Sequence, residues 1–245
     1  MSLTLIAILF FSIAVLYSSV GFGGGSSYIA ILLLAGFAIQ DVRMTALICN
    51  IIVVSGSCIN YFRAGIMPWK KVLPIVLLSV PLAFVGGMIE LESGMYKILA
   101  SILLILASIL MFVKVNQSEV KKEVSGIALS GIGGGIGFAS GTIGIGGGIF
   151  LSPILHLMNW QTAKVISATA SFFILINSIA GIAGQFTNHI SINFEALKVL
   201  GICVLIGGQL GNYINLKVLN QDKIRLFTAI LIGVIGIRIL FTQIY

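Results

Sequence analysis

The chain has 245 residues, of which 58% are hydrophobic and only 9% are charged. Soluble domains carry about 25% charged residues, so the composition excludes a water-soluble globular protein and indicates a chain that lies in a lipid bilayer. The net charge of +7 comes from basic residues in short loops, such as Lys70 and Lys71, which is typical of membrane-topology signals and not of a nucleic-acid-binding surface.

The first forty residues contain no charged side chain, and residues 124–163 form a second stretch of the same kind. As a single helix, each stretch would be about 60 Å long, twice the thickness of the hydrocarbon core. A glycine cluster lies in the middle of each stretch, GFGGG at 21–25 and GIGGG at 144–148, and glycine weakens a helix. We therefore expect a helix, a non-helical glycine loop and a short helix in each stretch, with the short helices over 25–37 and 148–158.

Three longer helices are expected after each short helix. The N-terminal run lacks the basic start of a signal peptide, so we count it as a helix that the protein keeps. The other helices are expected near 42–62, 71–90 and 95–114 in the first half and near 164–185, 195–216 and 222–243 in the second. The predicted fold class is an all-α polytopic membrane protein with about eight full spans and two short or re-entrant helices, broken from their neighbours at glycine-rich loops.

The two halves repeat one sequence pattern. VGFGGGSSYIAILLL at 20–34 matches IGIGGGIFLSPILHL at 143–157, and isolated matches continue as far as Ser55 and Ser178 at the same offset. Such a recurrence is the signature of internal repeats. The sequence therefore predicts two repeats of five segments each, residues 1–117 and 118–245.

Basic residues predict how the two repeats face the membrane. If each broken stretch turns back inside the bilayer, ten basic residues fall on one side and four on the other, which is a clear positive-inside bias. The loop at 63–71 has three basic residues, whereas its counterpart at 186–194 has none. Equivalent loops then face opposite sides, so the repeats are expected to be inverted. This topology places a multi-pass protein in the cell (inner) membrane, with both termini outside.

The glycine clusters are the first candidates for a binding site. Non-helical backbone at membrane depth is tolerated only where protein covers it or where it lines a wet cavity. The short helices would point their N-termini there, and free N–H groups at a helix N-terminus favour an anion. Because helix ends alone cannot offset the desolvation of an anion, hydroxyl and amide donors are needed as well. The expected solute-binding residues are Gly21, Gly23, Gly24, Gly25, Ser26, Ser27, Asn50, Thr142, Gly144, Gly146, Gly147, Gly148, Asn177 and Gln209.

Helix packing is an alternative role for several of these residues. Glycines let transmembrane helices approach closely, and packing is the better explanation for Gly131 to Gly137. Each amide side chain can also serve as a hydrogen bond between helices. Arg43 and Lys164 occupy nearly matching places in the two halves, and both are expected at the membrane interface, with a vestibule for anions as the other interpretation.

These motifs resemble those of the sulfite exporter TauE/SafE family of membrane transporters. GFGGG at 21–25, GIGGG at 144–148, Pro153 and SATAS at 167–171 carry the resemblance, which covers about residues 5–242. The first half departs from the family pattern, because Ala30 stands in the place of the proline. The resemblance implies export or exchange of sulfur-containing anions such as sulfite or organosulfonates.

The sequence thus predicts a transporter, and an exporter in direction, of a small sulfur-containing or related organic anion. Its expected partners are this solute and the lipid bilayer, with oligomer formation left open and no nucleic acid. No enzyme, catalytic residue, metal or cofactor is expected, because His156 and His189 belong to no ligand-spaced cluster and the cysteines form no pair motif. Two alternatives stay open: a membrane-embedded enzyme that uses His189, and a membrane assembly partner without transport activity.

Overall fold

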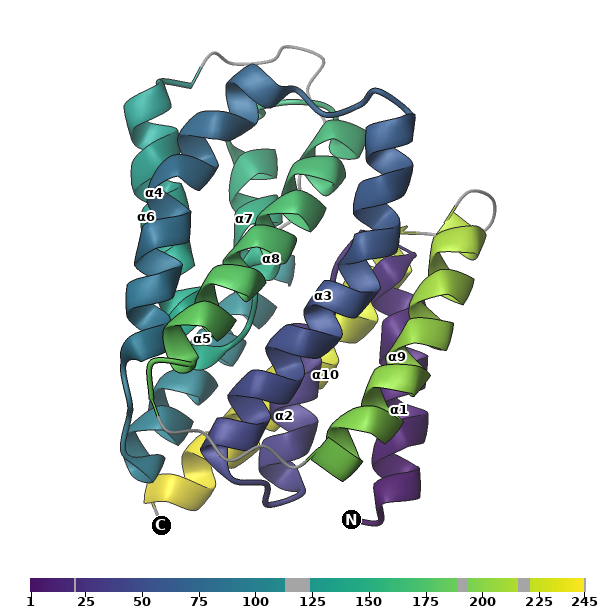
Figure 1. Ribbon diagram of the computed structural model, residues 1–245, viewed down its shortest axis with the longest axis vertical. Helices are drawn as coiled ribbons and strands as arrows, with labels where there is room; N and C mark the ends of the chain where they lie inside the picture. Colours follow the sequence, from purple (N-terminus) through teal and green to yellow (C-terminus); the bar gives the residue numbers. More distant parts are fainter. Residues whose placement is uncertain (20, 113–123, 189–193, 216–220, 245) are drawn as a thin grey trace.

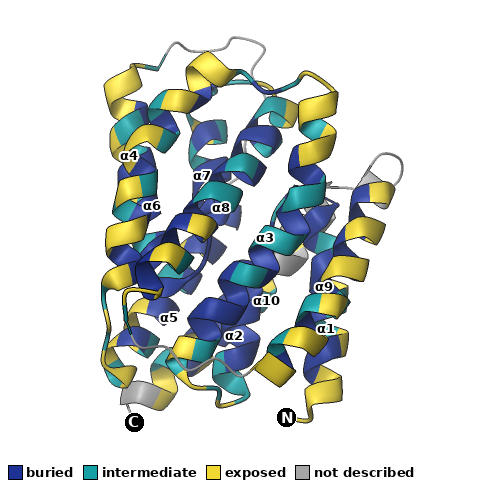
Figure 2. Cartoon of the chain, in the orientation of Figure 1, coloured by how far each residue is buried: buried dark blue, intermediate teal, exposed yellow. Residues whose placement is uncertain are grey.

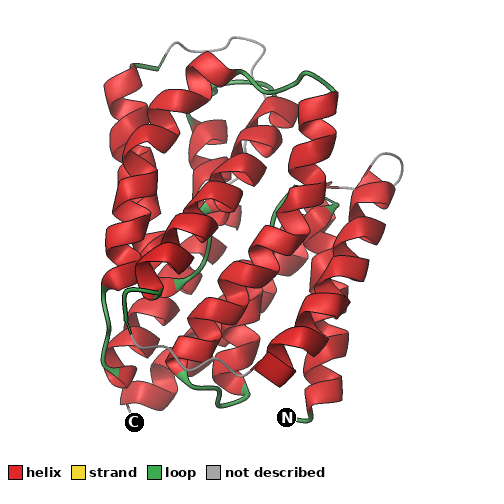
Figure 3. Ribbon diagram, in the orientation of Figure 1, coloured by secondary structure: helices red, strands yellow, loops and turns green. Residues whose placement is uncertain are grey.

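The structure is a computed structural model that describes residues 1–19, 21–112, 124–188, 194–215 and 221–244. The regular structure in these ranges is entirely helical, which confirms the predicted all-α class (Figure 3). The described helices are α1 (Leu3–Ser18), α2 (Gly25–Leu34), α3 (Ile39–Arg63), α4 (Trp69–Met88), α5 (Ser93–Phe112), α6 (Gly126–Ile143), α7 (Gly148–Leu157), α8 (Ala163–Gln185), α9 (Phe194–Asn215) and α10 (Gln221–Ile244).

Both uncharged stretches are interrupted at their glycine clusters. Helix α1 ends at Ser18 and α2 begins at Gly25, while α6 ends at Ile143 and α7 begins at Gly148. Gly24 and Gly147 precede the short helices with φ angles of 90° and 80°. Only glycine adopts this left-handed conformation without a steric cost, so the clusters allow the chain to change direction before each short helix.

Helix α2 is shorter than expected, because it ends at Leu34 and not at 37. Gly36 has a φ of 81°, and the N–H of Phe37 donates to the carbonyl of Leu32 at 3.1 Å. These features form a Schellman motif, which satisfies the last carbonyls of a helix and stops it. The other helices begin and end within three residues of the predicted positions.

Six of the described helices are long and apolar enough to cross a membrane: α3, α4, α5, α6, α8 and α9. Helices α1, α2 and α7 and the segment Ala229–Thr242 of α10 are shorter apolar helices, so the count of eight full spans stays a prediction. Large hydrophobic side chains are exposed, among them Leu77 and Ile202, and exposed residues lie along the outer helices of the bundle (Figure 2). An apolar outer surface of this kind is expected where lipid surrounds the protein.

The helices form a bundle in which distant parts of the chain lie side by side (Figure 1). Helix α4 packs against α6 and α8, helix α9 packs against α1 and α3, and α5 packs against α10. Both chain termini lie at one end of the bundle, and the loop that joins α3 to α4 lies at the other end. Of the basic residues used for the topology prediction, the side chains of Lys114, Lys121, Lys122, Lys217, Lys223 and Arg225 lie outside the described residues.

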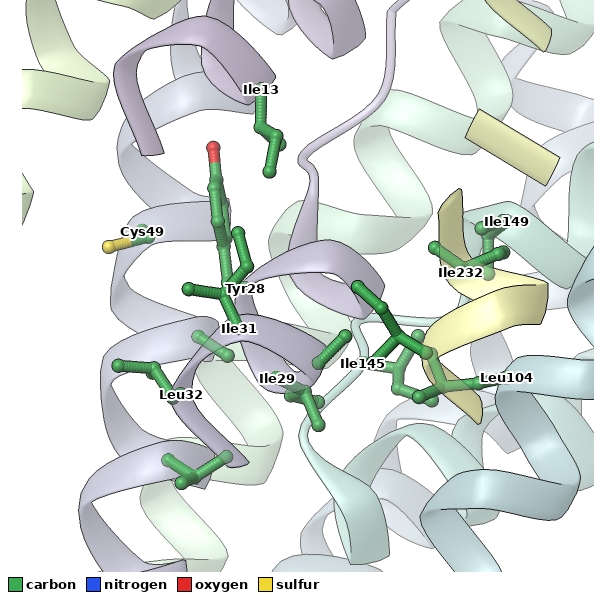
Figure 4. Packing of buried hydrophobic residues seen from close by; sticks show 14 of the residues in the cluster. Ile13, Tyr28, Ile29, Ile31, Leu32, Cys49, Leu104, Ile145, Ile149 and Ile232 are labelled. Atoms are coloured by element: carbon green, nitrogen blue, oxygen red, sulfur yellow. The ribbon is translucent and has the colours of Figure 1, made fainter. Parts of the chain in front are cut away.

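The short helix α2 lies in the interior, surrounded by apolar side chains. Tyr28 stacks on Phe10 of α1 with ring centroids 4.4 Å apart, and Ile29 and Leu32 are fully buried. Figure 4 shows these side chains between Ile13 of α1 and residues of α5, α7 and α10. This packing holds the N-terminus of α2 in place inside the bundle.

Close contact between α4 and α6 depends on glycines of α6. A Cβ atom on Gly133 would collide with the carbonyl oxygen of Ile75, and one on Gly137 would collide with that of Ser79. Gly131 and Gly135 on the same helix have open space in the corresponding direction. The packing interpretation of the glycines therefore applies to one face of α6.

We predict that Gly133→Ala lowers the free energy of unfolding by about 1–3 kcal/mol, because the added methyl group overpacks the α4–α6 contact. Gly135→Ala is the matched control, and it should be neutral or stabilise by up to about 1 kcal/mol through its higher helix propensity. Thermal unfolding of the purified protein in detergent micelles would measure both. Equal effects of the two substitutions would contradict this packing.

Candidate functional site

The N-termini of α2 and α7 border one small cavity in the interior. The cavity is lined by Tyr17, Phe22, Gly23, Gly24, Gly25, Ser26, Asn50, Ile145, Gly148, Ile149 and Ile174. It measures about 10 Å³ for the centre of a water-sized molecule, which is about the space that one water needs. The two glycine clusters, more than a hundred residues apart in the sequence, are thus brought together at one small site.

The N–H groups at these helix ends are free of protein partners. Neither α2 nor α7 has a side-chain cap. In the described part of the chain, no hydrogen bond engages the backbone N–H of residues 23–27 or 145–149; the next residues, Tyr28 and Phe150, donate to the carbonyls of Gly24 and Gly147. Unpaired donors and the positive ends of two helix dipoles therefore converge on the cavity.

Asn50 of α3 joins the two glycine loops. It is fully buried, and its Nδ2 donates to the carbonyl of Ile145 at 3.1 Å. Its side chain lies directly against Gly23 and Gly25 of one loop and Gly146 of the other. A Cβ on any of these glycines would collide with the amide, so the glycines allow Asn50 to sit between the loops.

Other buried polar atoms without a protein partner lie beside the same glycines. They include Asn50 Oδ1, the hydroxyl of Tyr28 and Ser178 Oγ; Tyr28 lies against Gly24 and Ser178 lies against Gly146. The sequence prediction did not include Tyr28 or Ser178 in the site. The match of Ser178 with Ser55 between the repeats was the available signal for the serine, whereas nothing in the sequence pattern distinguished Tyr28.

Some predicted site residues are engaged by neighbouring side chains. The carbonyl of Gly21 accepts a hydrogen bond of 2.5 Å from Ser171 Oγ. Ser27 lies in a hydrogen bond of 2.7 Å with the hydroxyl of Tyr17. Gly144 packs against the backbone of Arg43, and Gly147 packs against Phe173. None of these four predicted residues, nor Gly146, is among those that line the cavity.

Three further predicted residues are also absent from the cavity lining. Thr142 Oγ1 donates to the carbonyl of Phe138 within α6. Asn177 Nδ2 donates to the carbonyl of Phe173 within α8, and Gln209 is exposed next to Gly56 of α3. Their place in the structure corresponds to the packing role that was the alternative for such side chains.

Arg43 is buried, so the expectation of an interfacial side chain was wrong. Only 4% of its surface is exposed, and its guanidinium donates to the carbonyls of Gly87 and Ile89 in α4 and its C-cap and of Gly141 in α6, at 3.0–3.1 Å. The last carbonyls of a helix lack partners within the helix and carry the negative end of its dipole. Arg43 therefore fastens α3 to the ends of α4 and α6.

A second cavity lies near the opposite end of α3. It is lined by Ser57, Asn60, Tyr61, Ala64, Ile66, Lys164 and Asn212 and measures about 90 Å³ by the same criterion as the first. Lys164 is exposed. Tyr61 also reaches Gly21, since its hydroxyl lies 3.2 Å from where a Cβ of Gly21 would be. Tyr61 thus lines the second cavity and also lies against Gly21 at the first glycine cluster.

The enzyme alternative depended on His189. This residue lies outside the described residues. Within the described part of the chain, no group of three His, Cys, Asp or Glu side chains could hold a metal ion.

Comparison with known proteins gives the same class of protein throughout. The family model described as "Sulfite exporter TauE/SafE" matches residues 5–239. The "Probable membrane transporter protein y4hK" of Sinorhizobium fredii is 32% identical over 96% of this chain and 97% of its own length. The "Probable membrane transporter protein MJ0441" of Methanocaldococcus jannaschii is 26% identical over 97% and 95%. No solved structure matches the chain.

We predict that Arg43→Leu lowers the free energy of unfolding by about 3 kcal/mol, because buried carbonyls at the ends of α4 and α6 lose their donor. Arg63→Leu is the matched control, since Arg63 lies exposed in the last turn of the same helix and should change stability by about 0.5 kcal/mol or less. Chemical unfolding in micelles would compare them. A stable Arg43→Leu variant would show that the guanidinium does not fasten these helices.

Proposed function

Because the chain belongs to the sulfite exporter TauE/SafE family, we propose that this membrane transporter exports a small sulfur-containing or related organic anion, such as sulfite or a sulfonate. One observation carries the proposal: two helix N-termini with unpaired N–H groups meet at one interior cavity. The cell (inner) membrane is the proposed location.

The donors around the cavity suit an oxyanion. Each helix end contributes about 0.3–1 kcal/mol, and up to about 2 kcal/mol in a partly buried position, which does not offset the desolvation of an anion. The unpaired N–H groups of the lining residues Gly23, Gly24, Gly25, Ser26, Ile145, Gly148 and Ile149 and the hydroxyl of Ser26 offer further charge-assisted hydrogen bonds. The residues that line the cavity include no Asp or Glu, so no carboxylate repels an anion there.

A solute larger than water requires the site to open, and the proposed inverted repeats supply a way to do so. In these repeats α1 corresponds to α6, α3 to α8, α4 to α9 and α5 to α10. The α4–α6 contact then has the α9–α1 contact as its counterpart, and the α4–α8 contact has the α9–α3 contact. The α5–α10 and α3–α8 contacts are their own counterparts. This correspondence supports the proposed two repeats of five segments, 1–117 and 118–245. Rocking of one repeat against the other would then alternate access to a central site.

The second cavity is the proposed entrance from the cytoplasm. It lies at the end of α3 away from the two chain termini, which face outside in the proposed topology. Lys164 at its rim attracts anions, and Tyr61 in its lining lies against Gly21 at the first glycine cluster. An inside-negative membrane potential favours anion exit by about 2.3 kcal/mol per charge per 100 mV, so export needs no coupling carboxylate.

We predict that Gly25→Ala reduces the rate of sulfite efflux from proteoliposomes at least about tenfold. The added Cβ would collide with Asn50 Nδ2 and the carbonyl of Ile145, and a displacement that costs 1.4 kcal/mol is a tenfold effect. Gly94→Ala is the control, because Gly94 also opens a helix and has nothing within 4 Å. Equal rates in a folded Gly25→Ala protein would overturn the site.

Removal of the charge at the entrance should weaken capture of the anion. We predict that Lys164→Gln raises the KM for sulfite efflux about two- to fivefold, the effect expected for one exposed charge, and makes KM less dependent on salt. Lys198→Gln removes an exposed charge from the first turns of α9, away from the second cavity, and should leave KM unchanged. The same KM in both variants would count against this entrance.

A further inference from the structure

The unpaired oxygen of Asn50 has a defined orientation. Asn50 Nδ2 donates to the carbonyl of Ile145 at 3.1 Å, and only the nitrogen of the amide can make that bond. The amide is thereby fixed, and Oδ1 lies against Gly23 and Gly25 at the start of α2. Oδ1 is fully buried and has no partner in the protein, although its residue lines the central cavity.

An acceptor in this position constrains the ligand. Burial of a polar atom without a hydrogen bond is unfavourable, and a fully deprotonated oxyanion cannot relieve it, because such an anion carries only acceptors. The lone pairs of Oδ1 would instead repel an anionic oxygen. An anion that also carries an O–H or N–H group can donate to Oδ1 while its charged oxygens face the unpaired N–H groups of α2 and α7.

We propose that the central cavity selects monoanions that carry a hydrogen-bond donor close to the charged group. Hydrogensulfite is preferred over the sulfite dianion, and hydroxy-substituted sulfonates are preferred over plain alkyl sulfonates. Asn50 is the residue that determines this specificity. The inference rests on the proposed function, since it concerns the ligand of the same site.

A matched pair of anions isolates the donor. 2-Hydroxyethanesulfonate and propane-1-sulfonate have the same charge and nearly the same shape, and they differ only in a hydroxyl group that replaces a methyl group. Dissociation constants would be measured by thermal shift with the purified full-length protein in micelles. We expect the hydroxylated anion to bind about tenfold more tightly.

The variant Asn50→Leu replaces the acceptor with an apolar side chain of similar size. It should abolish the preference for the hydroxylated anion. Asn188→Leu removes an amide that lines neither cavity and donates to the carbonyl of Met88, and it should retain the preference. Equal affinities of the native protein for the two anions would overturn this inference and leave the proposed function standing. If neither sulfonate nor sulfite binds to the native protein, the proposed function fails as well. Should Asn50→Leu not fold, the affinities of the native protein for the two sulfonates still decide whether the inference holds.

Discussion

The structure depends on how two stretches of non-helical backbone are accommodated inside an apolar bundle. Backbone N–H and C=O groups need partners where water is excluded, and the glycine loops before α2 and α7 leave a row of N–H groups without any. Asn50 holds the loops together through the carbonyl of Ile145, and apolar packing around Tyr28 fixes the start of α2 (Figure 4). The unpaired donors are thus preorganised, which is the arrangement that an anion site requires.

The two ends of the bundle differ, and the difference gives the proposed transport cycle its direction. Towards one end, Lys164 and Tyr61 line the second cavity, and Tyr61 lies against Gly21. Elsewhere, Arg43 fastens α3 to the carbonyl ends of α4 and α6 beside the second glycine loop. Buried cation–carbonyl contacts of this kind are specific in geometry. In the proposed cycle, access from the side of Lys164 requires a change of the contacts at Tyr61, whereas a conformation open to the opposite side requires release of the contact that Arg43 makes with Gly141 of the second half.

Much of the fold could be predicted from the sequence, because hydrophobic length and glycine position are local properties. The breaks at 21–25 and 144–148 follow from uncharged stretches too long for one span, and the long helices follow from their apolar runs. The predicted end of α2 was three residues too late. The helix is stopped by the turn at Gly36, which involves only a few residues and does not interrupt the apolar run used for the prediction. The site side chains were harder to predict. Asn50, Asn177 and Gln209 all carry an amide within an apolar run, so the sequence does not distinguish them. Only the packing of α3, α8 and α9 decides which amide lines the cavity. Arg43 was expected at the membrane interface because its position near a helix end was visible in the sequence. The carbonyls that accept its hydrogen bonds belong to α4 and α6, which are distant in the sequence.

The proposed transport requires that an anion be held between the N-termini of α2 and α7. Selenite resembles sulfite in shape and charge, and selenium can be located directly by anomalous diffraction from crystals grown with it. We expect a selenium peak between Gly25 and Gly148, with selenite oxygens about 2.7–3.2 Å from backbone nitrogens of both helices. A peak confined to the cavity beside Lys164, or no peak within the bundle under conditions of sulfite transport, would contradict it.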